Sequence, residues 1–118
     1  MRRDLEEGIH LFNTQKYFEA HEALEAVWLR AEGDEKLFLH GLIQIAAAFH
    51  HHQHGNPAGF GSLLEKGVKK LEKFGESRAG LDLATFREQL RPWQELSRLA
   101  QAERTASPPP LPRISTPE

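Results

Sequence analysis

The segment from Glu35 to Gln53 constrains the fold most, because its apolar residues surround the helix axis almost completely. Such a helix needs other helices to cover it on most sides. Its apolar members are Leu37, Phe38, Leu39, Leu42, Ile43, Ile45, Ala46 and Phe49. One polar line, His40, Gln44 and His51, interrupts them. We expect this line to face polar partners, since an unpaired buried amide or imidazole costs about 1–3 kcal/mol.

Apolar residues at helical spacing predict four more helices around this central one. Two precede it, over about residues 4–13 and 15–31. A third begins at the Asn56 cap and Pro57, and a fourth at the Asp82 cap. Short connections make neighbouring helices antiparallel. We therefore predict an all-α fold, a compact multihelical bundle of about five helices built from antiparallel helical hairpins.

Several residues mark where these helices should begin, end or bend. Thr14 can cap the helix over 15–31, and Asp34 can cap the central helix. Gly33 has the character of a left-handed helix stop. Pro92 lies inside the last apolar pattern and removes a helical hydrogen bond, so we expect a kink or a break there.

The C-terminal stretch differs in composition from the rest of the chain. From residue 105 onward it holds five prolines in fourteen residues and has no apolar period. This predicts one helical domain over residues 1–104 and a Pro-rich flexible tail over 105–118. The PPPLP within the tail resembles ligands of proline-recognising domains, although a disordered terminus is the commoner explanation.

Charge and composition exclude several classes of function. The chain has no cysteine, which excludes thiol catalysis and thiolate metal ligands. A net charge of −2 gives no global field for collecting nucleic acid or an anionic membrane. The start, MRRDLEEG, does not read as a signal peptide, and no apolar run could span a bilayer. We expect a soluble, cytoplasmic protein with neither nucleic acid nor membrane as partner.

The helix over residues 15–31 carries the most unusual pattern. Tyr17, Ala20, Leu24, Val27, Trp28 and Ala31 form an apolar stripe on a wheel of about 100° per residue. His21 falls inside this stripe, Glu25 lies close beside it and Glu22 lies at its edge. The pattern therefore predicts that both glutamates point toward the core side, where they are either satisfied or used for chemistry.

One interpretation of these residues is metal chemistry. In HExxH enzymes two histidines four residues apart hold zinc while the intervening glutamate acts as a base. Here Glu25 replaces the second histidine and gives HExxE. A third ligand can come from the next helix through His40, His50 or His51. We predict a divalent-metal set of His21, Glu25 and His50, with Glu22 as the general base.

The alternative interpretations need no metal. The two polar lines can bond one another in a closed network that fixes the helices, or they can leave a pocket for an organic ligand. The predicted pocket residues are Tyr17, His21, Glu22, Glu25, Trp28, Gln44, His51 and Asn56. The run His50, His51, His52 and His54 can also chelate a metal, although a solvated helix end explains such a run as well.

Three separated blocks carry a family resemblance. They read LFNTQKYFEAHEALEAVW, GLIQIAAAFHH and GNPAGFGSLLEKGVKKL, in that order, within about residues 8–71. The chain resembles the small helical proteins grouped as domain of unknown function 309. The resemblance implies an all-α bundle and brings no activity with it.

Two functions follow as hypotheses. The first is a binding or scaffold module with a polar pocket between the helix over 15–31 and the central helix, whose partner is a small molecule or a protein. The alternative is a small metal-dependent hydrolytic enzyme that uses the HExxE residues. A homo-oligomer is compatible with either, because helices this apolar can leave a face to bury.

Overall fold

The computed structural model describes residues 3–99 and 108–115. Within them the all-α fold class is confirmed. The elements are α1 (Arg3–Asn13), α2 (Tyr17–Trp28), α3 (Gly33–Gln53), α4 (Pro57–Leu71), the 3₁₀ turn η1 (Glu72–Phe74), the antiparallel strands β1 (Ser77–Arg78) and β2 (Leu81–Asp82), and α5 (Leu83–Arg98). No helix in the described residues is long and apolar enough to cross a membrane.

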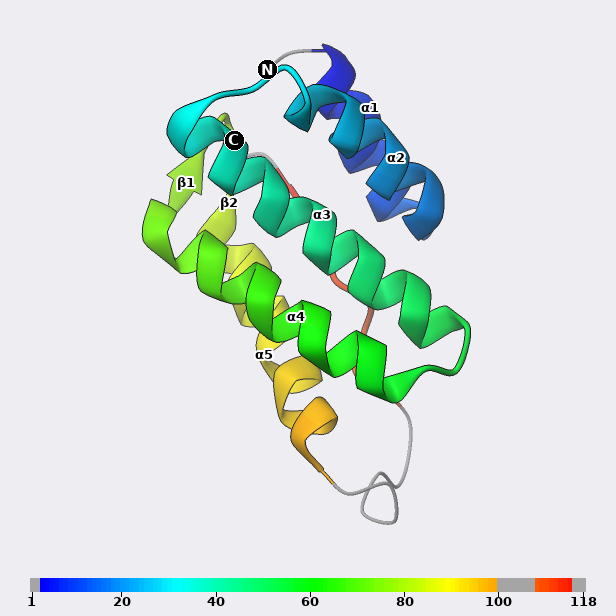
Figure 1. Cartoon of the computed structure of the whole chain (residues 1–118). Coiled ribbons are helices and arrows are strands. Elements are labelled where there is room, and N and C mark those ends of the chain that lie inside the picture. Colours follow the sequence, from blue (N-terminus) through cyan, green and yellow to red (C-terminus); the bar gives the residue numbers. More distant parts are fainter. Residues whose placement is uncertain (1–2, 100–107, 116–118) are drawn as a thin grey trace.

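The central position predicted for α3 is confirmed. It packs against α2 on one side and α4 on the other, while α1 pairs with α2 and α5 with α4 (Figure 1). Phe49 of α3 contacts aromatic rings from all four other α-helices, with ring centroids 6.1 Å from Phe12, 5.5 Å from Tyr17, 5.3 Å from Phe60 and 5.1 Å from Trp93. The apolar surface of α3 is thus the point where the sequence-distant helices meet.

Two glycines set the close approach of α3 and α4. A Cβ added to Gly67 would lie 2.6 Å from Cγ1 of Ile45 and 2.8 Å from the carbonyl oxygen of Gly41. A Cβ on Gly41 would in turn lie 3.2 Å from the carbonyl oxygen of Gly67. Only hydrogen fits at this crossing, so the two helix backbones pack directly against each other.

Three predictions about helix ends are wrong. Thr14 follows the end of α1, and its hydroxyl donates to the carbonyl oxygens of His10 and Leu11 in that helix, so it does not cap α2. Helix α2 ends at Trp28, not at residue 31. Gly33 has the predicted left-handed backbone, with φ +60°, but it is the first residue of α3 and does not end α2. The N-cap of α3 is Glu32, whose side chain makes no capping hydrogen bond, so Asp34 is not the cap. A tight turn therefore replaces the predicted last turn of α2.

Other local predictions are confirmed. The Asn56 side chain accepts a hydrogen bond from the Gly59 amide at 3.0 Å, and Asp82 accepts one from the Thr85 amide at 3.0 Å. Both caps satisfy amides that a helix start leaves free. The break expected at Pro92 does not occur, because α5 continues through this residue from Leu83 to Arg98.

Residues 108–115 are not a solvated tail. The Trp93 indole donates to the carbonyl oxygen of Pro110 at 2.9 Å. The Asn13 side chain accepts a hydrogen bond from the Ile114 backbone N–H at 2.7 Å and donates one to the Ile114 carbonyl oxygen at 2.8 Å. The Ile114 side chain is buried. Burial of one apolar side chain and paired backbone groups hold this segment against α1 and α5. The remaining residues of 105–118, and residue 104 at the predicted domain boundary, lie outside the described ones.

The glycine crossing yields a matched test within α4. We expect Gly67→Ala to destabilise the fold by about 1–3 kcal/mol, because the new methyl overlaps Ile45 and the Gly41 carbonyl. Gly61→Ala is the control, since its Cβ would meet Ser97 only at 3.5 Å and alanine favours the helix. Thermal melts of both variants should show a loss for Gly67→Ala and no loss for Gly61→Ala, and equal melting temperatures would contradict the packing argument.

Candidate functional site

Helices α2 and α3 run antiparallel with aromatic rings paired at both ends. The Trp28 ring lies 5.8 Å from the His40 ring at one end, and the Phe18 ring lies 5.5 Å from the His50 ring at the other. Between these pairs α3 presents Ala47, whose side chain is only a methyl group. A small residue between larger ones leaves space that neighbouring side chains do not fill.

Two adjoining hollows occupy this space, and we call them together the α2–α3 groove. The larger has a volume of about 230 Å³ and the smaller about 190 Å³. The larger is lined by His21, Glu25, Trp28, His40, Ile43, Gln44, Ala47 and, from α4, Leu63. The smaller is lined by Phe18, His21, Ala47, His50 and His51. His21 and Ala47 belong to both, so they form the wall at which the two hollows meet.

The His21 Nδ1 and the Tyr17 hydroxyl are the two buried side-chain polar atoms without a hydrogen-bond partner among the described residues, and of the two only His21 lines the groove. The His21 ring is nearly parallel to that of Phe18, with an interplanar angle of 11° and centroids 6.5 Å apart. A buried polar atom without a partner costs about 1–3 kcal/mol. The His21 ring lines both hollows of the α2–α3 groove, while its unsatisfied Nδ1 lies buried beneath their surface.

The polar line of α3 does not bond to the acids of α2, as a closed network would require. The Gln44 Oε1 accepts a hydrogen bond from Lys70 Nζ of α4 at 2.8 Å. The His51 Nδ1 lies 3.1 Å from the Asn56 amide nitrogen in the loop before α4. Within the described residues no hydrogen bond joins this line to Glu22 or Glu25. Its partners come from the α4 side, and the α2 side stays open.

The predicted inward orientation of the two glutamates is wrong, since both are exposed. The buried face of α2 is centred on Ala20 and Leu24, which places His21 at its edge and the glutamates beyond it. Glu25 still reaches the rim and lines the larger hollow, whereas Glu22 lines neither. Glu22 therefore lacks the position in the groove that the predicted general base needs.

Tyr17 belongs to the core and not to the groove. It is buried against Phe12 and Phe49, with ring centroids 5.2 Å and 5.5 Å away. Burial raises the pKa of its hydroxyl to about 12. Asn56 caps α4 and reaches the groove only through His51.

The predicted metal ligands are not brought together. No group of three His, Asp or Glu side chains in residues 3–99 and 108–115 could hold a metal ion. His21 and His50 share the smaller hollow, while Glu25 lines the larger one. Since structural and catalytic zinc sites use three or more protein ligands, HExxE spacing alone does not make one here.

Sequence reasoning missed three residues of this region. Leu63 closes the larger hollow from α4, Ala47 creates the space, and Lys70 holds Gln44. Apolar spacing gives no signal for the first two, because a leucine or an alanine on a helix face is ordinarily packing. Lys70 follows from no local pattern, since its partner is 26 residues away in sequence.

Burial and like charges shape the electrostatics beside the groove. Burial lowers the pKa of His40, and the nearby Lys70 lowers it further. Burial also lowers the pKa of Lys70, as do Lys66, Lys73 and Lys69. At the other end burial lowers the pKa of His50, with smaller contributions from its neighbouring histidines. The fold thus favours neutral imidazoles at both ends of the groove.

Fold and groove together define a small all-α bundle protein with a surface groove beside its central helix. Within that class the chain belongs to the family described as "Domain of unknown function (DUF309)", whose model matches residues 5–63, half of the chain. An uncharacterized protein of Aquifex aeolicus (strain VF5) is 30% identical over 84 residues, which are 70% of this chain and 25% of that protein. The uncharacterized protein YpuF of Bacillus subtilis (strain 168) is 38% identical over 71 residues, 59% of this chain and 40% of YpuF. The chain thus spans less than half the length of either relative.

Stability measurements should separate His21 from a structural polar residue. We expect His21→Leu to leave the melting temperature unchanged or to raise it, because it removes an atom that the fold leaves unpaired. Gln44→Leu is the control and should lower stability by about 1 kcal/mol, since Lys70 loses its acceptor. A clear destabilisation by His21→Leu, equal to that of Gln44→Leu, would show that His21 is a structural residue.

Acid should destabilise the fold through its half-buried histidines. Burial lowers the pKa of His40, His50 and His52 below 6.5. The unfolded chain then takes up protons first, so stability falls as the pH drops through 6.5 toward the lower folded-state values. Melts between about pH 7.5 and about pH 5.5 should show this loss.

A substitution at His52 tests whether a histidine with a lowered pKa causes the loss of stability in acid. The His52 ring lies 4.8 Å from the Trp93 ring in the aromatic core, and we expect His52→Gln to reduce the loss on acidification. His54→Gln, at an exposed position, is the matched control and should leave most of the loss of stability on acidification in place. A melting temperature independent of pH in the unmodified protein would contradict the burial argument.

Proposed function

We propose that this DUF309 chain is a binding module whose α2–α3 groove receives a side chain, or a group of similar size, from a protein partner. The observation that carries the proposal is the position of His21 at the junction of the two hollows, together with its buried Nδ1 that has no hydrogen-bond partner among the described residues. Such an atom gains free energy when the ring turns and a partner group in the groove bonds to it. The cytoplasmic location expected from the sequence is part of the proposal.

The size of each hollow, taken singly, fits one side chain. Sites for drug-sized molecules have volumes of about 300–1,000 Å³. The hollows, at about 230 and 190 Å³, are each smaller than that. A single amide or phenol group has the size that fits one hollow, and protein interfaces commonly place such anchors in pockets.

The chemistry of the lining favours a group that combines hydrogen bonding with apolar carbon. His21 Nδ1 and the exposed carboxylate of Glu25 offer polar contacts, while the Gln44 amide nitrogen adds a donor because its oxygen bonds Lys70. Trp28 and Leu63 supply apolar walls. Tyrosine, asparagine and glutamine side chains match this combination.

Side-chain analogues test the proposal directly. We expect acetamide or p-cresol, added to ¹⁵N-labelled protein, to shift the NMR resonances of His21, Gln44 and Ala47. Ala47→Leu should abolish the shifts, because the added carbons fill the junction of the hollows. Ala26→Leu places the same change at an exposed position of α2 and should leave them intact.

Other outcomes would overturn the proposal. Shifts that persist in Ala47→Leu, or that map away from the groove, would remove the groove as the binding site. Near-stoichiometric uptake of zinc or manganese, with shifts at His21 and Glu25, would instead support the metal-dependent alternative.

A further inference from the structure

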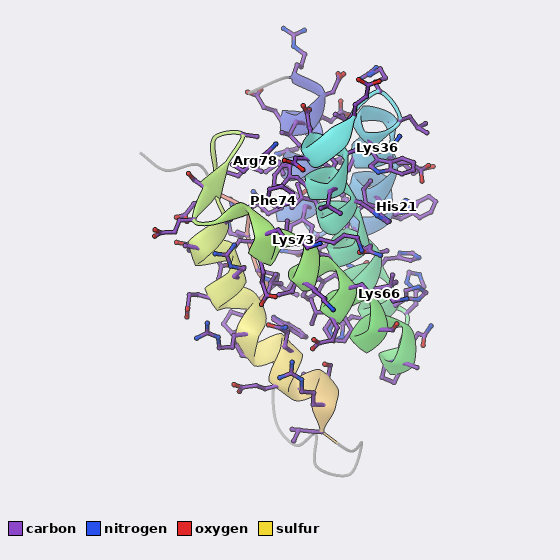
Figure 2. The ribbon with its side chains drawn as sticks, turned by 60° about the vertical axis from the view of Figure 1, so that its left-hand side comes forward. His21, Lys36, Lys66, Lys73, Phe74 and Arg78 are labelled. Atoms are coloured by element: carbon purple, nitrogen blue, oxygen red, sulfur yellow. The ribbon has the colours of Figure 1, made fainter. Side chains whose placement is uncertain are left out.

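The face that contains the groove carries opposite charges on its two edges. Helix α2 has three glutamates and no basic residue, with Glu22 and Glu25 exposed. Helix α4 and η1 carry Lys66, Lys70 and Lys73 at helical spacing. Figure 2 shows Lys66, Lys73 and His21 together on this side of the molecule. The face thus has an acidic edge on α2 and a basic edge on α4, with α3 between them.

No ion pair joins these edges within the described residues of one chain. Helices α2 and α4 each pack against α3, and Leu63 of α4 lines the hollow that Glu25 and Trp28 of α2 also line. Water and salt screen exposed charges over about 8 Å. In the described residues Glu22, Glu25, Lys66 and Lys73 form no ion pair, whereas Arg30, Arg91 and Arg98 each do. Glu22, Glu25, Lys66 and Lys73 are therefore free to pair with another molecule, whereas Lys70 already donates one hydrogen bond to Gln44 and has two further N–H donors.

The two edges also lie at similar heights along α3. Glu25 lines the same hollow as Gln44, and Lys70 bonds Gln44 from the other side, so Glu25 and Lys70 flank one residue of α3. Helices α2 and α4 both run antiparallel to α3 and hence parallel to each other. One turn earlier on each helix stand Glu22 and Lys66. The acidic and basic positions thus lie within about one helical turn of each other along α3, a difference that the long Lys70 side chain spans when it reaches Gln44.

We propose that this face binds a second copy of the same chain, related by a twofold axis that runs parallel to α3. Such an axis exchanges the two edges while keeping the height along α3. It places Glu22 opposite Lys66 of the second copy and Glu25 opposite Lys70 of the second copy, and each pair occurs twice. This inference rests on the proposed function for the role of the groove as a protein-binding surface and names its partner.

The strength of the dimer should depend on exposed ion pairs and on a small apolar contact. Exposed ion pairs are weak individually and weaken with salt, so the dimer depends on concentration and on ionic strength. The apolar residues Trp28 and Leu63 lie between the edges and are half-buried in the single chain. They become covered on association, which adds a contribution that salt does not screen.

Complementary charge reversals test the pairing by analytical ultracentrifugation. The unmodified chain should dimerise at low salt. Glu22→Lys alone and Lys66→Glu alone should each weaken dimerisation about tenfold or more, because each homodimer then holds two like-charge contacts. An equimolar mixture of the two variants should restore it, since every contact in the heterodimer is again between opposite charges.

Controls and contrary outcomes follow from the same design. Glu95→Lys and Arg91→Glu, both exposed on α5, make the same charge changes away from the face and should leave dimerisation unchanged. A monomer at every concentration, a dimer indifferent to both reversals, or a mixture that stays monomeric would each overturn the proposal. A monomer that instead binds poly-glutamate through Lys66 would assign the basic edge to an acidic partner and overturn it too.

The failure of this inference is distinguishable from that of the proposed function. Neither Glu22 nor Lys66 lines the groove, so the side-chain analogues can be titrated into monomeric Lys66→Glu protein. If the analogues bind but no dimer forms, the groove remains the proposed binding site and only the proposal that a second copy is its partner is wrong.

Discussion

The structure depends first on the direct contact between α3 and α4 at Gly41 and Gly67. Because no side chain separates the backbones there, α4 lies deep against α3 and brings Phe60 and Lys70 to it. The aromatic core around Phe49 and the bond from Lys70 to Gln44 both require that approach. One steric constraint thus positions the core and one side of the groove.

The α2 side of α3 is packed differently, and this difference makes the site. The small residue Ala47 lies between larger side chains, so the helices meet at both ends and leave the two hollows between. The polar groups of α3 are satisfied from α4, which leaves His21 without a partner. The asymmetry between the two sides of α3 explains why the groove is polar and open.

The sequence predicted the features that depend on local chemistry. An all-round apolar helix identified α3, and Asn56 and Asp82 marked helix starts that the structure confirms. It did not predict where the polar groups of α3 find partners, because Lys70 reaches Gln44 across a tertiary contact. The apolar stripe of α2 is centred on Ala20 and Leu24 and not on His21, and for this reason the predicted inward orientation of the two glutamates is wrong. The proline-rich composition likewise concealed the burial of Ile114, whose backbone bonds Asn13 about a hundred residues earlier.

The central claim is that His21 is unpaired in the free protein and bonds a partner group in the groove. Long-range ¹H–¹⁵N spectra of the histidine rings, recorded with and without p-cresol, measure this directly. The account predicts that the His21 ring nitrogens respond to p-cresol while those of His52, in the aromatic core, do not. A His21 ring hydrogen already bonded to a protein group in the free protein, and unmoved by p-cresol, would contradict it.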